Sequence, residues 1–178
     1  MAVCVAIAAH GADDLMAQLL RLQKTIREYS IINDWTPDGE TGQVLSTTLK
    51  IDSKTKKTTL VYDRTYSTHE GDESHFTQQN IEYKLTLSEL DIESVTVTKM
   101  EGTLSERPLW MVRVATIDKK ETIPYSNLFE IQFSDGTRDA STSNSKVAEV
   151  TIGYFEDKAK AAEIADRVRN VILTSAEN

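Results

Sequence analysis

The chain has 178 residues but only one cysteine, Cys4, and only seven glycines. A single cysteine excludes a disulfide within the chain. The glycines do not cluster, and the phosphate-binding patterns G-x-G-x-x-G and G-x-x-x-x-G-K-[ST] are absent, which argues against a nucleotide site. The G-x-S-x-G nucleophile elbow is absent as well. The sequence therefore predicts no cofactor and no catalytic residues, and it favours a protein that is not an enzyme.

The chain also has fewer basic than acidic residues. It contains 20 Lys and Arg and 28 Asp and Glu, so its formal net charge is -8. An acidic chain repels the phosphates of nucleic acids and anionic lipid head groups, so we expect no nucleic-acid partner. Long hydrophobic runs are missing too, and we expect no transmembrane segment. The length and the 39% hydrophobic content are typical of one globular domain.

The first residues are the most apolar part of the chain. An uncharged run from Ala2 to Ala9 leads into the small residues of "AAHGA", as the apolar region of a signal peptide leads into its cleavage site. We therefore predict that residues 1–12 are a signal-peptide remnant and that the protein is exported to the periplasm or cell envelope. A basic segment before the run is lacking. The alternative is that residues 1–12 are folded, as a strand or a helix start, in a cytoplasmic protein.

Two segments have the apolar spacing of amphipathic helices. The first covers residues 13–30, and the second covers residues 156–173 and is rich in alanine. Asp157 is suited to cap the second helix. We expect one globular domain over residues 13–174 and a frayed tail over residues 175–178.

Between the helices the apolar period changes to two, which is typical of strands. Two polar stretches, residues 67–79 and 134–146, are expected to be loops, and Trp35 is expected in the core. Short connections favour antiparallel pairing. The predicted fold is α+β and mainly antiparallel β, with about seven or eight strands in a bent barrel or sandwich, an N-terminal helix and a C-terminal capping helix.

The C-terminal strand and helix carry a pattern, F-x-D-x-x-x-A-x-x-x-A, formed by Phe155, Asp157, Ala161 and Ala165. With the strands before it, this region resembles bacterial domains of unknown function with the pleckstrin-homology-like fold, and it also resembles small exported bacterial proteins. The resemblance covers at most residues 43–173. It implies a bent barrel or sandwich of antiparallel strands with a C-terminal helix at one open end.

The same resemblance implies a ligand site. In pleckstrin-homology domains that bind phosphoinositides, basic residues around the first hairpin hold the phosphates, and clustered cations suit that task. The residues in the comparable place here are Lys50, Lys54, Lys56, Lys57 and Arg64. The plainer interpretation, which we prefer, is that exposed lysines protect a turn and strand edges from aggregation.

The stretch "STHEGDESHF" contains two histidines and three carboxylates. A zinc site needs three or four converging ligands, and the helical motif H-E-x-x-H spaces its histidines four residues apart. Here His69 and His75 are separated by six positions with Gly71 between them. We interpret the stretch as a solvated loop, with no metal site and with these histidines as weak candidates only.

Three functional hypotheses follow. The first is an exported binding or accessory module of the cell envelope without enzymatic activity. The second is a carrier of a small ligand, or an enzyme, with its site in the mouth of the barrel. The third is a cytoplasmic interaction scaffold. The partner is either a protein or a small ligand, and the sequence does not determine the oligomeric state.

Overall fold

The computed structural model describes residues 2–52, 57–70, 73–101, 103–105 and 107–176. Along the described chain, one α-helix precedes nine β-strands and a second α-helix follows them. In order, the elements are α1 (Ala2–Tyr29), β1 (Ile32–Trp35), β2 (Thr41–Ile51), β3 (Thr58–Glu70), β4 (Glu73–Leu85), β5 (Thr96–Met100), β6 (Leu109–Ala115), β7 (Ile123–Gln132), β8 (Arg138–Val147), β9 (Glu149–Phe155) and α2 (Lys158–Ala176).

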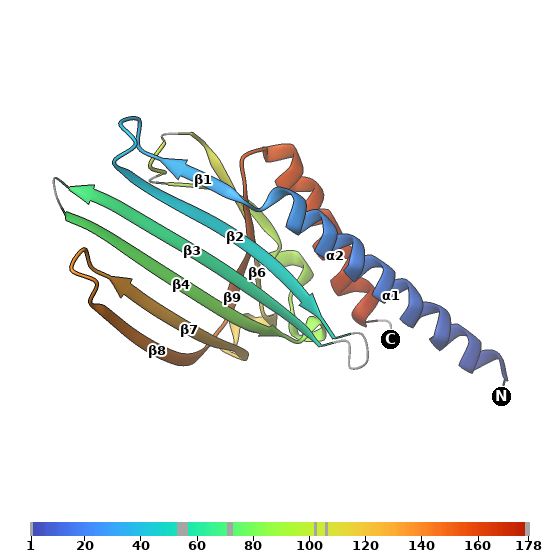
Figure 1. Cartoon of the computed structure of the whole chain (residues 1–178). Coiled ribbons are helices and arrows are strands. Elements are labelled where there is room, and N and C mark those ends of the chain that lie inside the picture. The colour runs from blue at the N-terminus through green and yellow to red at the C-terminus, as the bar shows by residue number, and fades with distance from the viewer. Residues whose placement is uncertain (1, 53–56, 71–72, 102, 106, 177–178) are drawn as a thin grey trace.

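The strands form two antiparallel sheets. The large sheet has the order β1-β2-β3-β4-β7-β8, and the small sheet has the order β5-β6-β9. The small sheet lies behind the large one in Figure 1, with both helices at one end. The α+β class, the antiparallel pairing and the two terminal helices are therefore confirmed. The described strands do not close into a barrel, because β1 and β8 each have a neighbour on one side only.

The strand count exceeds the prediction partly because β8 was expected to be a loop. All ten residues of β8 pair with β7 without a register shift. The strand is exposed on both faces along nearly its whole length, so no apolar residue is needed at every second position and the usual signal is missing. The turn before it, at Asp135-Gly136, gives the local clue, since Gly136 has a φ of 82°.

The stretch "STHEGDESHF" is also mostly strand rather than loop, and the loop prediction there was wrong. β3 continues to Glu70 and β4 begins at Glu73, so the two strands form one long hairpin. Backbone pairing extends to its end, where His69 pairs with Ser74 and His75 with Thr68. Cross-strand hydrogen bonds satisfy the backbone there, so polar side chains are tolerated on both strands. Residues 71 and 72 lie outside the described part.

Helix α1 begins at Ala2, well before the predicted start at residue 13. Its described buried residues begin with Leu15, and Leu19 and Ile26 are completely buried. Export and cleavage of residues 1–12 stay predictions. None of the described helices is both long enough and apolar enough to cross a membrane.

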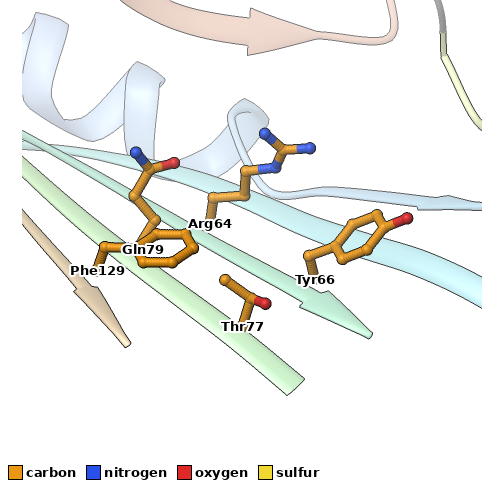
Figure 2. Close-up of a pocket in the computed structure, with 5 residues that line it drawn as sticks. All are labelled: Arg64, Tyr66, Thr77, Gln79 and Phe129. Atoms are coloured by element: carbon orange, nitrogen blue, oxygen red, sulfur yellow. The ribbon is translucent and has the colours of Figure 1, made fainter. Parts of the chain in front are cut away.

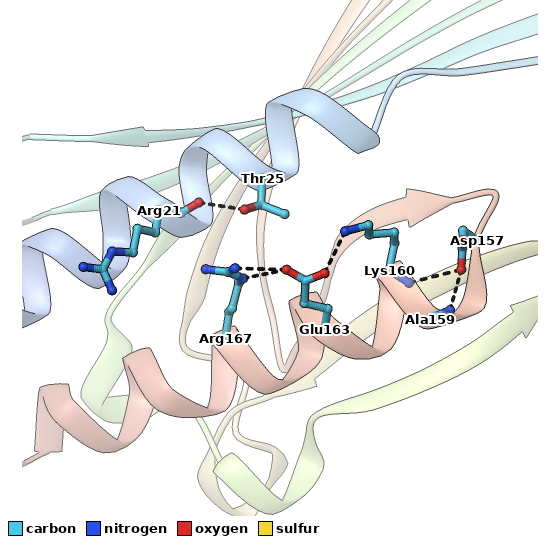
Figure 3. A network of polar contacts seen from close by, with 7 residues as sticks. All are labelled: Arg21, Thr25, Asp157, Ala159, Lys160, Glu163 and Arg167. Carbon is cyan, nitrogen blue, oxygen red and sulfur yellow. Dashed lines mark hydrogen bonds and ion pairs between the residues drawn. The ribbon is translucent and has the colours of Figure 1, made fainter.

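The larger core lies where both helices meet the sheets. Leu19 and Ile26 of α1 join Leu49 and Leu60 of the large sheet. Helix α2 contributes Ala161, Ile164, Ala165, Val168, Val171 and Ile172. On its other side Glu163 accepts hydrogen bonds from Lys160 and Arg167 (Figure 3), so the apolar stripe is buried and the charged residues remain at the surface. The helix extends to Ala176, past the predicted start of the tail.

A smaller core lies between the two sheets. Leu109 of β6 packs there with Ile32 of β1 and Leu45 of β2, whereas Val112 of the same strand belongs to the larger core. Successive strand residues point to opposite faces, so the small sheet is covered on both faces. The small sheet packs against the large sheet near β1 and β2. The strand β8, at the other edge of the large sheet, stays exposed.

Trp35 is 39% exposed, so the expectation that it lies in the core was wrong. It is the last residue of β1, the edge strand, and pairs with Gly42. A Cβ atom at Gly42 would come within 2.1 Å of the Trp35 ring. The indole therefore covers a backbone position that only glycine permits, outside the core.

Candidate ligand-binding site

The inner face of the large sheet is the face that packs against the helices and the small sheet. On β3 it carries every second residue, from Leu60 through Arg64 to Tyr66. Register pairs Arg64 with Gln79 of β4, and Gln79 with Phe129 of β7. Directly paired residues share a face, so side chains from three neighbouring strands meet on the inner face.

These residues line a pocket of about 240 Å³, whose described lining is Arg64, Tyr66, Thr77, Gln79 and Phe129. All five are half-buried. In Figure 2 the side chains of Arg64 and Gln79 rise from the sheet on the same side, and the Phe129 ring lies beside Gln79. The pocket thus combines one guanidinium, one amide, the hydroxyls of Thr77 and Tyr66, and two aromatic rings.

Arg64 has an unusual environment for a cation. Its Nε atom is buried and has no hydrogen-bond partner, and no ion pair joins Arg64 to a carboxylate within the described chain. Its guanidinium carbon lies 5.7 Å from the centre of the Tyr66 ring, a modest cation–π contact. Leaving a buried donor such as this Nε without a hydrogen bond is costly, and an anion in the pocket would supply the missing acceptor.

The other polar groups of the pocket are also available for a ligand. Neither the Thr77 hydroxyl nor the Gln79 amide takes part in a side-chain hydrogen bond with another described residue. The amide offers two donors and the hydroxyl one. Together with Arg64 they can hold several oxygens of one anionic group.

A layer of tyrosines lies beside the pocket, between the sheets. The ring centres of Tyr62 and Tyr154 are 5.4 Å apart, and those of Tyr83 and Tyr125 are also 5.4 Å apart. Burial, and then the neighbouring Tyr154, raises the pKa of Tyr62. Burial, and then Tyr125, raises the pKa of Tyr83 to about 12. Both phenols are neutral at physiological pH, so they add no negative charge beside Arg64.

Buried polar atoms without a partner gather on the inner face as well. Besides Arg64 Nε they include Gln43 Oε1, Thr47 Oγ1 and Asn127 Oδ1. Such atoms usually bind ordered water or a ligand. Their concentration on one face supports the inner face as the place where a polar molecule binds.

The structure separates the basic residues that the pleckstrin-homology resemblance grouped together. Lys50 and Lys57 line a surface groove of about 820 Å³, Arg64 lies in the inner pocket, and Lys54 and Lys56 lie outside the described residues. Lys50 pairs with Thr59 whereas Arg64 pairs with Leu45, and this register places the two cations on opposite faces of the sheet.

The groove itself carries both signs of charge. Lys84 and Lys146 line it with Lys50, but Asp52 and Glu89 line it too. Lys50 also lies 3.8 Å from Glu82. Exposed lysines with nearby carboxylates need no further anion, and the plainer interpretation of these lysines fits the groove better than a binding role.

The histidines form no described metal site. The ring of His75 meets the ring of Phe133 edge-on, with 5.6 Å between the centres, and the side chain of His69 lies outside the description. Within the described residues, no group of three or more His, Cys, Asp or Glu side chains is placed to hold a metal ion.

Sequence reasoning singled out Arg64 but missed Thr77, Gln79 and Phe129. The available signal was the alternation of "FTQQNIEY", in which Thr77 and Gln79 occupy the same face as Ile81 and Tyr83. Polar residues at core-facing positions of a strand are candidates for function.

A scan against protein-family models, a search of curated proteins and a search of solved structures each find no match for this chain. The resemblance to pleckstrin-homology-like domains therefore stays a prediction.

Proposed function

We propose that this protein is a binding module that holds a small organic anion on the inner face of its large sheet. The observation that carries the proposal is Arg64, a half-buried guanidinium that borders a pocket and has no carboxylate partner among the described residues. The proposal follows the carrier hypothesis from the sequence, with an open sheet face in place of a barrel mouth.

The composition of the pocket supports binding rather than catalysis. The described lining holds no carboxylate, histidine, cysteine or lysine, and these groups supply most general bases and nucleophiles. An arginine, an amide and a hydroxyl instead recognise an anion by hydrogen bonds. The aromatic rings offer contact area to an apolar part of the ligand.

Substitution of Arg64 tests the proposal. Small organic anions are screened by thermal shift at constant ionic strength against the wild type and Arg64→Gln. Arg138→Gln serves as the matched control, because Arg138 is an exposed arginine of the same sheet. We expect at least one anion to raise the Tm of the wild type and the control but not that of Arg64→Gln.

The stability of the Arg64→Gln variant without any ligand provides a second test. Because the buried Nε of Arg64 has no hydrogen-bond partner among the described residues, replacement of Arg64 by glutamine should leave the free energy of unfolding unchanged or raise it by about 1 kcal/mol. A loss of several kcal/mol on urea denaturation, or anion binding that does not depend on Arg64, would overturn the proposal.

A further inference from the structure

We infer that the preferred ligand is an aromatic monocarboxylate, an inference that rests on the proposed function and names the class of anion. Three features of the pocket carry it: the single positive charge, the geometry of the hydrogen-bond donors, and the placement of the rings. Each feature excludes a different group of competing ligands.

The first feature is that Arg64 is the only lysine or arginine on the inner face of the described strands of the large sheet. Register places the others on the outer face, where they are Lys50, Lys84, Arg138 and Lys146. One cation balances one negative charge. A dianion would bring a second negative charge that no cation on the inner face balances, in a protein whose net charge is -8. Removing such a charge from water is costly.

A carboxylate on the inner face strengthens this selection. Asp139 pairs with Ile131, and Ile131 pairs with Thr77 of the pocket, so Asp139 lies in the same cross-strand row as Thr77. Asp139 is exposed, so its negative charge adds only a weak, salt-screened repulsion of ligands with a second negative group that extends toward β8. The pocket therefore selects monoanions.

The second feature is the set of donors. A guanidinium presents parallel N–H groups that match the two oxygens of a carboxylate. Arg64 and Gln79 are directly paired across β3 and β4, and Figure 2 shows both side chains on the same side of the sheet. With the Thr77 hydroxyl they satisfy the few lone pairs of a carboxylate, whereas a phosphate monoester offers more oxygens and more charge than this set balances.

The third feature is the pair of rings, which come from different strands. Tyr66 lies on β3 and Phe129 on β7, and both line the pocket with the polar groups between them. Aromatic rings favour offset or edge contacts with another ring. The volume of about 240 Å³ lies below the range of roughly 300–1,000 Å³ that is typical for drug-sized ligands. The ligand therefore has one ring and a short linker.

Isothermal titration calorimetry tests the class with five probes, of which three each lack one property of the proposed ligand class. Benzoate and phenylacetate carry both a ring and one charge, acetate lacks the ring, benzyl alcohol lacks the charge, and phenyl phosphate is mostly a dianion at about pH 7.5. We expect benzoate or phenylacetate to bind at least about 10-fold more tightly than the other three.

Phe129→Leu keeps an apolar side chain but removes a ring. It should weaken the aromatic carboxylate about 3- to 10-fold and leave acetate unchanged, whereas Arg64→Gln should abolish binding of every anionic probe. Preference for phenyl phosphate or acetate, with dependence on Arg64, would overturn the ligand class but keep the proposed anion site. Absence of any binding that depends on Arg64 would overturn both.

Discussion

Among the described residues, Asp34 is a buried charge whose carboxylate is fully hydrogen-bonded. Its carboxylate, 1% exposed, accepts hydrogen bonds from the Gln43 amide, from the backbone N–H groups of Leu104 and Ser105, and from the Ser105 hydroxyl. These bonds fasten the segment between β5 and β6 to β1 at the edge of the large sheet. Arg64, by contrast, has no such set of partners among the described residues, and this contrast motivates the proposal that a ligand supplies them.

The hydrogen bonds of Asp34 predict a pH dependence of stability. Burial raises the pKa of Asp34, but the bonds from Ser105, Gln43 and Leu104 outweigh it, so the pKa lies below its usual value. A carboxyl group with a lowered pKa stabilises the fold above the unfolded pKa, near about 4, and this contribution is lost as pH falls through the lower folded pKa.

We therefore expect Asp34→Asn to lower the free energy of unfolding by about 2 kcal/mol at neutral pH. The gap to the wild type should shrink as the pH approaches about 3. Urea denaturation at both pH values measures this, with Asp139→Asn on the exposed edge strand as the control. A gap that stays constant with pH would show that the ionised form of Asp34 is not what stabilises the loop.

At the scale of the element, helix α2 has a well-defined start. Asp157 Oδ1 accepts hydrogen bonds from the backbone N–H groups of Ala159, at 2.6 Å, and Lys160, at 3.2 Å (Figure 3). These are donors of the first turn that have no partner within the helix. The cap was predicted from the sequence and is confirmed.

We expect Asp157→Ala to lower the free energy of unfolding by about 1 kcal/mol, and Asp157→Ser to retain most of it, because serine also caps helices. Guanidinium denaturation followed by circular dichroism checks the pair. Asp166→Ala, on the exposed side of the same helix, controls for the loss of a surface charge. Equal losses in all three variants would rule out a capping role.

At the scale of the whole molecule, α1 is part of the core rather than an appendage. Leu19 is completely buried and its neighbour Leu20 is 51% exposed, so the two form a matched pair. Leu19→Ala should cost about 3–5 kcal/mol through lost burial and a cavity. Leu20→Ala should change stability by no more than about 0.5 kcal/mol.

Thermal and urea denaturation of the two leucine variants measure this difference. A large loss of stability for Leu19→Ala alone would show that the second half of α1, after the residues predicted to be a signal, stabilises the domain. Similar small effects of both substitutions would mean that the domain is stable without α1, and the predicted domain boundary near residue 13 would then have to move toward the sheet.

Much of the fold could be predicted because burial leaves a period in the sequence. The stripes of α1 and α2, and the alternation of Ile81, Tyr83 and Leu85, each reflect one buried face. β8 could not be predicted in this way because neither of its faces is buried. The end of the β3–β4 hairpin was missed for a related reason, since its polar residues are ordered by backbone pairing.

The sequence by itself determined the α+β class, both helices and most strands, because hydrophobic spacing is a local property. Alternation along β3 also implies that Arg64 shares a face with Leu60 and Tyr62, although the sequence-based prediction grouped it with Lys50. Only the tertiary structure decided that this cation has Gln79 and Phe129 as neighbours and no carboxylate partner in the described chain, while Lys50 lies on the opposite face. Register and sheet order bring together residues far apart in the chain, and local spacing does not contain that information.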